Sequence, residues 1–136
     1  MTAGYSGTPL PKKLGVKEGS RVAWLSAPGH FDALLGELPD GVSVARRLSG
    51  GIDVLVQFAT SRAELRRRLP KLKDAVFPAG AAWVSWPKRS SGVATDITED
   101  TIREDALPLG LVDVKVAAID ETWSGLKLVV RKELRR

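Results

Sequence analysis

The chain has 136 residues, which suits a single domain, and its 43% hydrophobic and 27% charged residues exclude a natively disordered protein. Its 21 Lys and Arg residues exceed the 16 Asp and Glu residues, so the net charge is +5 and the protein is mildly basic. Cysteine is absent and histidine occurs once, at His30, so the composition excludes disulfide bonds and thiolate chemistry and predicts no metal site.

The first half of the chain predicts an N-terminal arm and the beginning of a sheet. Residues 1–20 are rich in Gly, Pro and Lys, which is typical of an irregular segment. A single domain is expected over residues 21–132, followed by a charged tail at 133–136. Short apolar runs that end in Gly or Pro predict strands, and apolar residues at helical spacing predict a helix. The predicted elements here are a strand at 21–26, a helix at 30–38, and strands at 42–45 and 52–58.

The second half alternates helices and strands. Ser61 and Glu64 have the spacing of a capping box, so a helix is expected to begin there, and Pro70 is expected to kink or split it. Gly110 is typical of the residue that follows a helix. The other predicted elements are a strand at 81–86, a helix between 96 and 110, and strands at 111–119 and 126–131.

This order of elements predicts a three-layer α/β protein. Right-handed crossovers wind alternating strands and helices into a mainly parallel sheet with helices on both faces. The connection between the last two strands is too short for a crossover helix, so these strands are expected to pair as an antiparallel hairpin. The sequence therefore predicts a Rossmann-like, mainly parallel, six-stranded sheet with a C-terminal antiparallel hairpin.

Parts of the predicted sheet resemble the class I S-adenosylmethionine-dependent methyltransferase fold. Residues 53–56 (DVLV) stand where that fold has its fourth strand, and residues 77–84 (FPAGAAWV) look like the stretch that leads into its fifth strand. The Gly-Leu pair at 110–111 and the hairpin after it are similar to the end of that domain. The resemblance covers roughly residues 20–132 and implies a shortened methyltransferase-like fold. It does not by itself imply an activity, because common folds host many functions.

Short motifs along the whole chain are similar to a small uncharacterised bacterial family, the domain-of-unknown-function family 3052. This resemblance implies no particular activity. The motifs are residues 4–10 (GYSGTPL), 12–15 (KKLG), 86–88 (WPK), 91–96 (SGVATD) and 120–127 (DETWSGLK).

The sequence departs from the methyltransferase pattern at the residues that hold the cofactor. Methyltransferases have a Gly-rich loop after the first strand, whereas residues 26–30 (SAPGH) offer one glycine and a proline without an N–H. Their second strand ends in an acidic residue that binds the ribose, whereas Arg46 and Arg47 stand here. Residues 57–60 (QFAT) replace the Asn/Asp-Pro-Pro-Tyr motif, and a helix-strand-helix segment is missing before residue 52. No cofactor is therefore expected.

The loop after the fourth predicted strand is the candidate ligand site. Ligands of open parallel sheets bind beyond the carboxyl ends of the strands, where residues 28–30, 58–61 and 86–95 are expected to meet. Two cations, two hydroxyls and flexible backbone suit a phosphate or carboxylate, and the other interpretation is a solvated, mobile loop. The candidate anion-binding residues are Lys88, Arg89, Ser90, Ser91 and Gly92, together with His30.

His30 and the pair Asp120-Glu121 are the candidates for acid–base chemistry. His30 is the only side chain that ordinarily titrates near neutral pH. Catalysis by His30 needs a partner, and Asp32 is too near in sequence to indicate one. The favoured interpretation is a capping or surface histidine and an acidic turn, so no catalytic residue is expected.

Basic residues gather on the predicted helix that follows Ser61. Leu65, Leu69 and Leu72 claim its inner face, so the basic residues are expected to point outward. A solvated face is favoured, and nucleic-acid binding is the alternative. The basic residues are Arg62, Arg66, Arg67, Arg68, Lys71 and Lys73, with Lys12, Lys13, Arg46 and Arg47 elsewhere in the chain.

These observations favour a non-catalytic binding or regulatory domain on a degenerate methyltransferase-like scaffold, with a small anionic ligand or a protein as partner. The alternatives are a divergent S-adenosylmethionine-dependent methyltransferase and a basic nucleic-acid-binding protein. No apolar run approaches the roughly 18 residues of a membrane span, and the N-terminus lacks a secretory signal pattern. The protein is therefore expected in the cytoplasm, away from membranes, and is not expected to be an enzyme.

Overall fold

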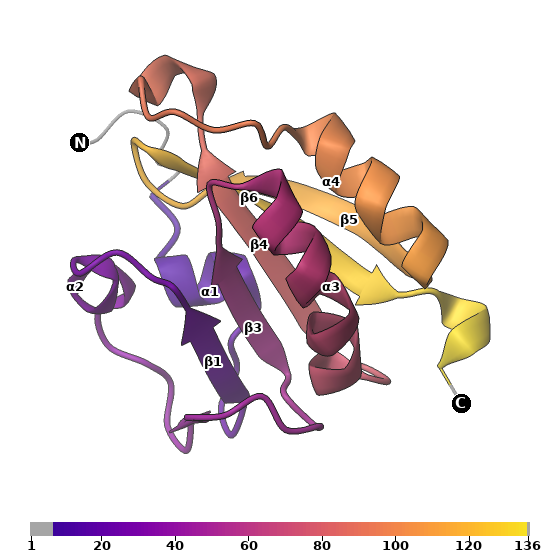
Figure 1. Cartoon of the computed structure of the whole chain (residues 1–136). Coiled ribbons are helices and arrows are strands. Elements are labelled where there is room, and N and C mark those ends of the chain that lie inside the picture. Colours follow the sequence, from indigo (N-terminus) through magenta and orange to yellow (C-terminus); the bar gives the residue numbers. More distant parts are fainter. Residues whose placement is uncertain (1–6, 136) are drawn as a thin grey trace.

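Six strands form one sheet in the structure, a computed structural model that describes residues 7–135 (Figure 1). The sequence motif at residues 4–10 and the predicted arm lie partly outside these described residues. The strands stand in the order β2-β1-β3-β4-β6-β5 across the sheet. Their bounds are β1 Arg21–Leu25, β2 Ser43–Val44, β3 Val54–Phe58, β4 Ala81–Pro87, β5 Leu111–Ala118 and β6 Trp123–Val130.

The pairing of the strands confirms the predicted sheet. Strands β2, β1, β3 and β4 are parallel neighbours, and Val22 of β1 stands opposite Val54 of β3. Strand β6 is antiparallel to β4 and to β5, so β5 and β6 form the expected C-terminal hairpin. The carboxyl ends of β1, β3, β4 and β5 consequently lie along the same edge of the sheet, which we call the carboxyl edge.

Helices cover both faces of this sheet (Figure 1). The residues of α3 and α4 pack on one face, with Leu69 and Ile102 fully buried against Leu55 and Leu128 of the sheet. The residues of α1 and α2 pack on the other face, in a cluster that includes Trp83. The helices are α1 Leu10–Leu14, α2 Phe31–Leu35, α3 Arg62–Val76 and α4 Glu99–Ala106, with short 3-10 turns η1 Arg89–Ser91, η2 Leu107–Leu109 and η3 Lys132–Leu134.

The segment before β1 belongs to the packed body of the protein from Leu10 onward. Leu10, Leu14 and Val16 are all buried. The indole Nε1 of Trp83, which has no exposed surface, donates a 3.0 Å hydrogen bond to the backbone oxygen of Leu14. This bond ties α1 to the middle of the sheet, because a buried indole N–H needs an acceptor.

Several predicted boundaries differ from the structure. Helix α2 ends at Leu35 instead of residue 38, because Gly36 turns the chain with a φ of 67°. Strand β6 begins at Trp123 instead of 126, since the N–H groups of Ile119 and Asp120 both bond to the Trp123 oxygen and close a tight hairpin. Pro70 neither splits nor interrupts α3: burial of the apolar face holds the helix continuous from Arg62 to Val76.

Among residues 7–135, no helix is both long and apolar enough to cross a membrane.

Candidate functional site

The carboxyl edge contains one point where the strand order reverses. From β1 the chain leads to β2 on one side of the sheet, whereas from β3 it leads to β4 on the other side. In open α/β sheets, ligands bind in the crevice that forms between two such diverging connections. Residues 26–30, after β1, and residues 59–61, after β3, therefore flank the expected binding crevice.

The loop after β1 leaves room for a ligand close to its backbone. Ser26 has a φ of 56°, the left-handed conformation that glycine ordinarily supplies in such turns. A Cβ atom added at Gly29 would meet nothing within 4 Å. Within the described part of the chain, the N–H groups of Gly29 and His30 donate to no other residue. Although it is poor in glycine, this loop thus has the left-handed turn and the open backbone that the sequence pattern argues against.

A buried amide at the end of β3 faces this loop with an unsatisfied acceptor. The Nε2 of Gln57 donates to the Phe58 oxygen at 2.8 Å and lies 3.5 Å from the hydroxyl of Ser26. Its Oε1 is buried and has no hydrogen-bond partner among residues 7–135. A buried acceptor without a partner costs about 1–3 kcal/mol, so a donor from a bound ligand is favoured there.

His30 and Asp120 meet at the carboxyl edge although 90 positions separate them in the chain. The Nε2 of His30 lies 2.7 Å from Oδ2 of Asp120, which belongs to the turn between β5 and β6. The other carboxylate oxygen, Oδ1, accepts hydrogen bonds from the backbone N–H groups of Thr122 and Trp123 at 2.8 and 2.7 Å. Partial burial favours a raised pKa of Asp120, but these hydrogen bonds outweigh it and hold the pKa below its usual value.

A row of aromatic rings adjoins this pair through Phe31 and Trp123. Trp24, Phe31, Phe58 and Trp123 contact one another edge to face, with ring centroids 5.6, 5.0 and 5.1 Å apart along the row. Phe31 follows His30 directly in the chain, and the backbone N–H of Trp123 donates a hydrogen bond to the carboxylate of Asp120. Packed aromatic pairs of this kind fix the elements that carry them. The sequence identifies each of these residues as apolar, but it does not reveal that their rings contact one another.

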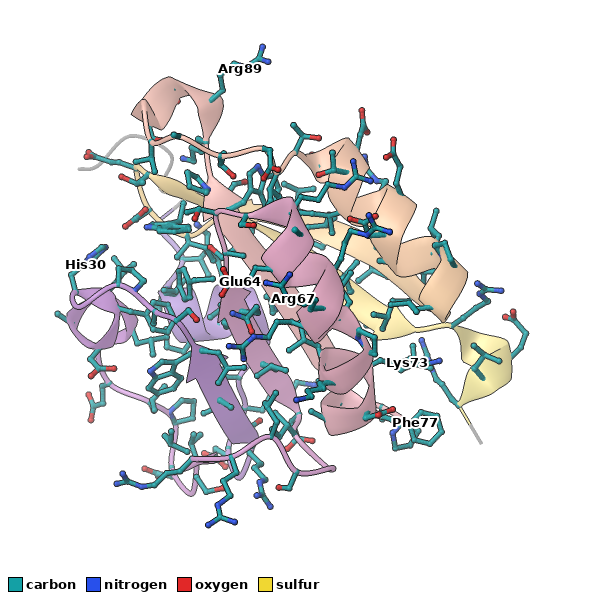
Figure 2. The ribbon with its side chains drawn as sticks, in the orientation of Figure 1. His30, Glu64, Arg67, Lys73, Phe77 and Arg89 are labelled. Atoms are coloured by element: carbon teal, nitrogen blue, oxygen red, sulfur yellow. The ribbon has the colours of Figure 1, made fainter. Side chains whose placement is uncertain are left out.

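Of the predicted anion-binding residues after β4, Arg89 lies apart from His30 (Figure 2), whereas the backbone N–H of Lys88 bonds to Thr122 in the turn that carries Asp120. Figure 2 shows Arg89 pointing away from the body of the protein, well separated from His30. The hydroxyl of Ser91 donates to the Lys88 oxygen at 2.6 Å and also accepts from Val93, so it serves the fold of its own loop. Gly92, with a φ of 77°, ends the short turn η1, in which Ser90 is exposed. Anion binding by this loop stays a prediction.

A cavity of about 400 Å³ lies behind this loop, beside the start of α4. The hydroxyl of Thr95 donates to the Thr60 oxygen at 2.6 Å, which connects the cavity wall to the loop after β3. The cavity is lined by Trp86, Pro87, Arg89, Gly92, Val93, Ala94, Thr95, Ile97, Thr98 and Glu99.

The end of β2 lacks the carboxylate that holds a ribose in dinucleotide-binding folds. Arg46 and Arg47 are both exposed there, so this position offers hydrogen-bond donors instead of an acceptor. The structure agrees with the sequence in this departure.

The basic residues of α3 divide into a paired and an unpaired group. Arg62 bonds to Asp105 and Glu104 of α4, and these carboxylates raise the pKa of Arg62 further above its usual value. Arg67 points outward (Figure 2), and within residues 7–135 neither it nor Lys71 forms a salt bridge. A nucleic-acid partner for this face stays a prediction.

Comparison with known proteins places the fold. No protein-family model and no curated protein matches the chain. Among solved structures, an S-adenosylmethionine-dependent methyltransferase from Aquifex aeolicus has a TM-score of 0.63 and 16% identity, over 89% of this chain and 88% of that one. Fibrillarin from Aeropyrum pernix, solved with natively bound S-adenosyl-L-methionine, has a TM-score of 0.56 and 16% identity, over 93% and 70%. The tRNA methyltransferase TrmK of B. subtilis has a TM-score of 0.52 and 11% identity, over 94% of this chain and 68% of that one.

These structures confirm the Rossmann-like, methyltransferase-like fold. They also correct one prediction: the expectation that the chain is not an enzyme is wrong, because the solved structures that share its fold include an S-adenosylmethionine-dependent methyltransferase and a tRNA methyltransferase. That prediction counted the glycines of the first loop, whereas Ser26 adopts the backbone conformation for which glycine is usually needed. The resemblance to the domain-of-unknown-function family has no support from a family model.

Proposed function

We propose that the chain is an S-adenosylmethionine-dependent methyltransferase. The observation that carries the proposal is the open backbone at Gly29, which lies where the strand order reverses in a sheet of methyltransferase type. The fold supports the same function, since it extends over nearly the full length of a methyltransferase of similar size.

The residues at the crevice fit this cofactor on three grounds. The turn at Ser26 and the open space at Gly29 let a ligand approach the backbone, and the N–H groups of Gly29 and His30 are available as donors to its carboxylate. The Oε1 of Gln57 is an acceptor suited to an amino or hydroxyl group of the adenosyl moiety. When bound, S-adenosylmethionine supplies a methyl group on a positively charged sulfur.

One contact of the usual binding mode has no counterpart. The guanidinium groups of Arg46 and Arg47 donate hydrogen bonds but cannot accept one from the ribose hydroxyls. The usual ribose contact at the end of β2 is therefore not made by this chain. Binding would therefore rest on the loop after β1 and on the end of β3.

A substitution at Gly29 tests this placement of the cofactor. Gly29→Leu is expected to weaken binding of S-adenosylhomocysteine, the demethylated product, at least about tenfold in titration calorimetry, which is about 1.4 kcal/mol. The new side chain would occupy the space that the ligand needs. The melting temperature should stay that of the wild type, because a Cβ there meets nothing within 4 Å.

Gly50→Leu is the matched control for this substitution. Gly50 is likewise exposed, and a Cβ at Gly50 also meets nothing within 4 Å, but it precedes β3 at the opposite edge of the sheet. Its affinity for S-adenosylhomocysteine should equal that of the wild type. Equal affinity in both variants would place the ligand away from the loop after β1, and no heat with the wild type would overturn the proposed function.

A further inference from the structure

His30 and Asp120 have the arrangement of a base and the residue that orients it. The imidazole belongs to the loop that follows β1, next to Gly29, and the carboxylate belongs to the turn between β5 and β6. The Asp120 side chain is only 12% exposed, whereas that of His30 is 55% exposed. The buried carboxylate is held by two backbone N–H groups, and the exposed imidazole belongs to the loop that flanks the expected crevice.

The hydrogen bond to Asp120 decides which nitrogen of His30 is free. Asp120 is ionised at neutral pH, because its hydrogen bonds keep its pKa low. An ionised carboxylate only accepts hydrogen bonds, so Nε2 of His30 must carry the proton that is shared with it. The other nitrogen, Nδ1, then keeps its lone pair. Within the described residues, Nδ1 has no hydrogen-bond partner.

Other charged groups near the pair come from each element that surrounds it. Asp32 lies in α2 and is exposed, and Glu121 lies beside Asp120 in the hairpin turn and is also exposed. Lys13 of α1 donates to the Ala118 oxygen at the base of the hairpin. Lys88, after β4, bonds through its backbone N–H to Thr122. Of the carboxylates of Asp32, Asp120 and Glu121, that of Asp120 is the one that contacts the imidazole of His30.

We propose that His30 is the general base of the methyl transfer, that Asp120 positions it, and that the acceptor is a hydroxyl compound. The inference rests on the proposed function, because it needs a methyl donor bound beside Gly29. In the step, the acceptor oxygen bonds to the methyl carbon and its O–H proton passes to Nδ1 of His30. The bond between methyl carbon and sulfur breaks with its electron pair on sulfur, which becomes a neutral thioether.

The charge balance of this step suits the pair. A positive charge disappears from sulfur and appears on the imidazole, where the carboxylate of Asp120 at 2.7 Å stabilises it. A general base is required where the nucleophile does not ionise by itself. Carboxylates are ionised at neutral pH and thiols are partly so, whereas a phenolic hydroxyl has a pKa near 10, so the pair selects for hydroxyl acceptors.

Two matched probes separate the role of the base from the activity itself. Phenol and thiophenol share a ring, but thiophenol ionises readily and phenol does not. With phenol as acceptor, His30→Ala is expected to lower the rate about a hundredfold to ten-thousandfold. With thiophenol the same variant should be nearly as fast as the wild type. Added imidazole should restore part of the phenol rate, because His30 is exposed and its removal leaves an open site.

Substitutions of Asp120 and of its neighbour Glu121 provide the second pair of variants. Asp120→Asn should lower the phenol rate at least about tenfold, and Glu121→Gln, the exposed neighbour, should not change it. The rate of the wild type should fall as the pH decreases, because the base becomes protonated, and this acid limb should disappear in His30→Ala. A purely structural role of His30 would leave the shape of the pH profile unchanged.

Acylation of the imidazole gives a readout without any cofactor. Diethyl pyrocarbonate acylates an imidazole nitrogen that carries no proton, and because His30 is the only histidine, one imidazole adduct in a mass spectrum reports this residue. The adduct should form more slowly in Asp120→Asn than in the wild type and at the wild-type rate in Glu121→Gln. Equal rates in all three proteins would contradict the pairing of His30 with Asp120.

The outcomes distinguish failure of this inference from failure of the proposed function. If the wild type binds no S-adenosylhomocysteine and methylates neither probe, the methyltransferase itself is refuted. If His30→Ala binds S-adenosylhomocysteine like the wild type and methylates phenol equally fast, His30 is not the base. If S-adenosylhomocysteine binds but phenol is not methylated, the hydroxyl class of acceptor is wrong.

Discussion

Replacing Val54 with aspartate is expected to unfold the protein at room temperature. Val54 is 5% exposed, begins the central strand β3 and stands between Val22 of β1 and Ala81 of β4. A carboxylate at this position would be buried among apolar neighbours without a partner, and the cost is several kcal/mol. A domain of this size is held by about 5 to 15 kcal/mol, so most of its stability would be lost.

The same substitution at Val114 is the control. Val114 lies on the edge strand β5 and is 55% exposed, so an aspartate there stays solvated. Circular dichroism during urea denaturation should give Val114→Asp a midpoint close to that of the wild type and Val54→Asp no cooperative transition. A cooperative transition with a wild-type midpoint in Val54→Asp would mean that β3 is not the central buried strand.

Replacing Gly80 with alanine is the second change for which a large loss of stability is expected. A Cβ atom at Gly80 would lie 2.1 Å from the backbone oxygen of Ile52 and 2.9 Å from that of Val76. Both are backbone atoms, so no side chain can rotate to relieve the overlap, and the junction between α3 and β4 must shift. Ordinary overpacking costs about 1–3 kcal/mol, and this overlap is expected to reach or exceed the upper value.

Gly50→Ala provides the comparison for this variant, since its added Cβ meets nothing within 4 Å. Thermal unfolding followed by differential scanning calorimetry should show a melting temperature lowered by more than about 10 °C in Gly80→Ala and by little in Gly50→Ala. Equal melting temperatures would show that the segment between α3 and β4 is less tightly packed than the structure has it.

Local sequence signals were sufficient for the succession of the strands along the chain and for their mainly parallel direction with a final antiparallel hairpin. Branched apolar residues mark β3, and the short link before Trp123 dictates an antiparallel hairpin, because a crossover needs more residues. The behaviour of Pro70 was not predictable in the same way. Whether a helix survives an internal proline depends on the energy of burying Leu65, Leu69 and Leu72, which is a property of the folded sheet.

The candidate site was only half visible in the sequence. His30 and Asp120 each attract attention, but 90 positions separate them and no spacing rule joins residues of a first loop and a last hairpin. Their contact follows from the strand order, which brings the hairpin turn to the carboxyl edge. The aromatic row from Trp24 to Trp123 is hidden for the same reason, because each ring comes from a different element.

The loop after β1 shows why residue identity is an incomplete guide to backbone shape. Counting glycines argues against a nucleotide-binding turn, because few other residues adopt a positive φ. Ser26 nevertheless does so, with a φ of 56°. The neighbouring residue Gly29 has no positive φ and contributes something else, namely open space above the chain.

S-adenosylmethionine is proposed to bind where the connections of β1 and β3 diverge. Titration of the ¹⁵N-labelled protein with S-adenosylhomocysteine, followed by amide chemical shifts, tests this placement directly. At about 1 mM ligand, the largest shifts should fall on Ala27, Gly29, His30, Ala59 and Thr60. A spectrum without shifts at that concentration, or shifts confined to residues 88–98, would contradict the claim.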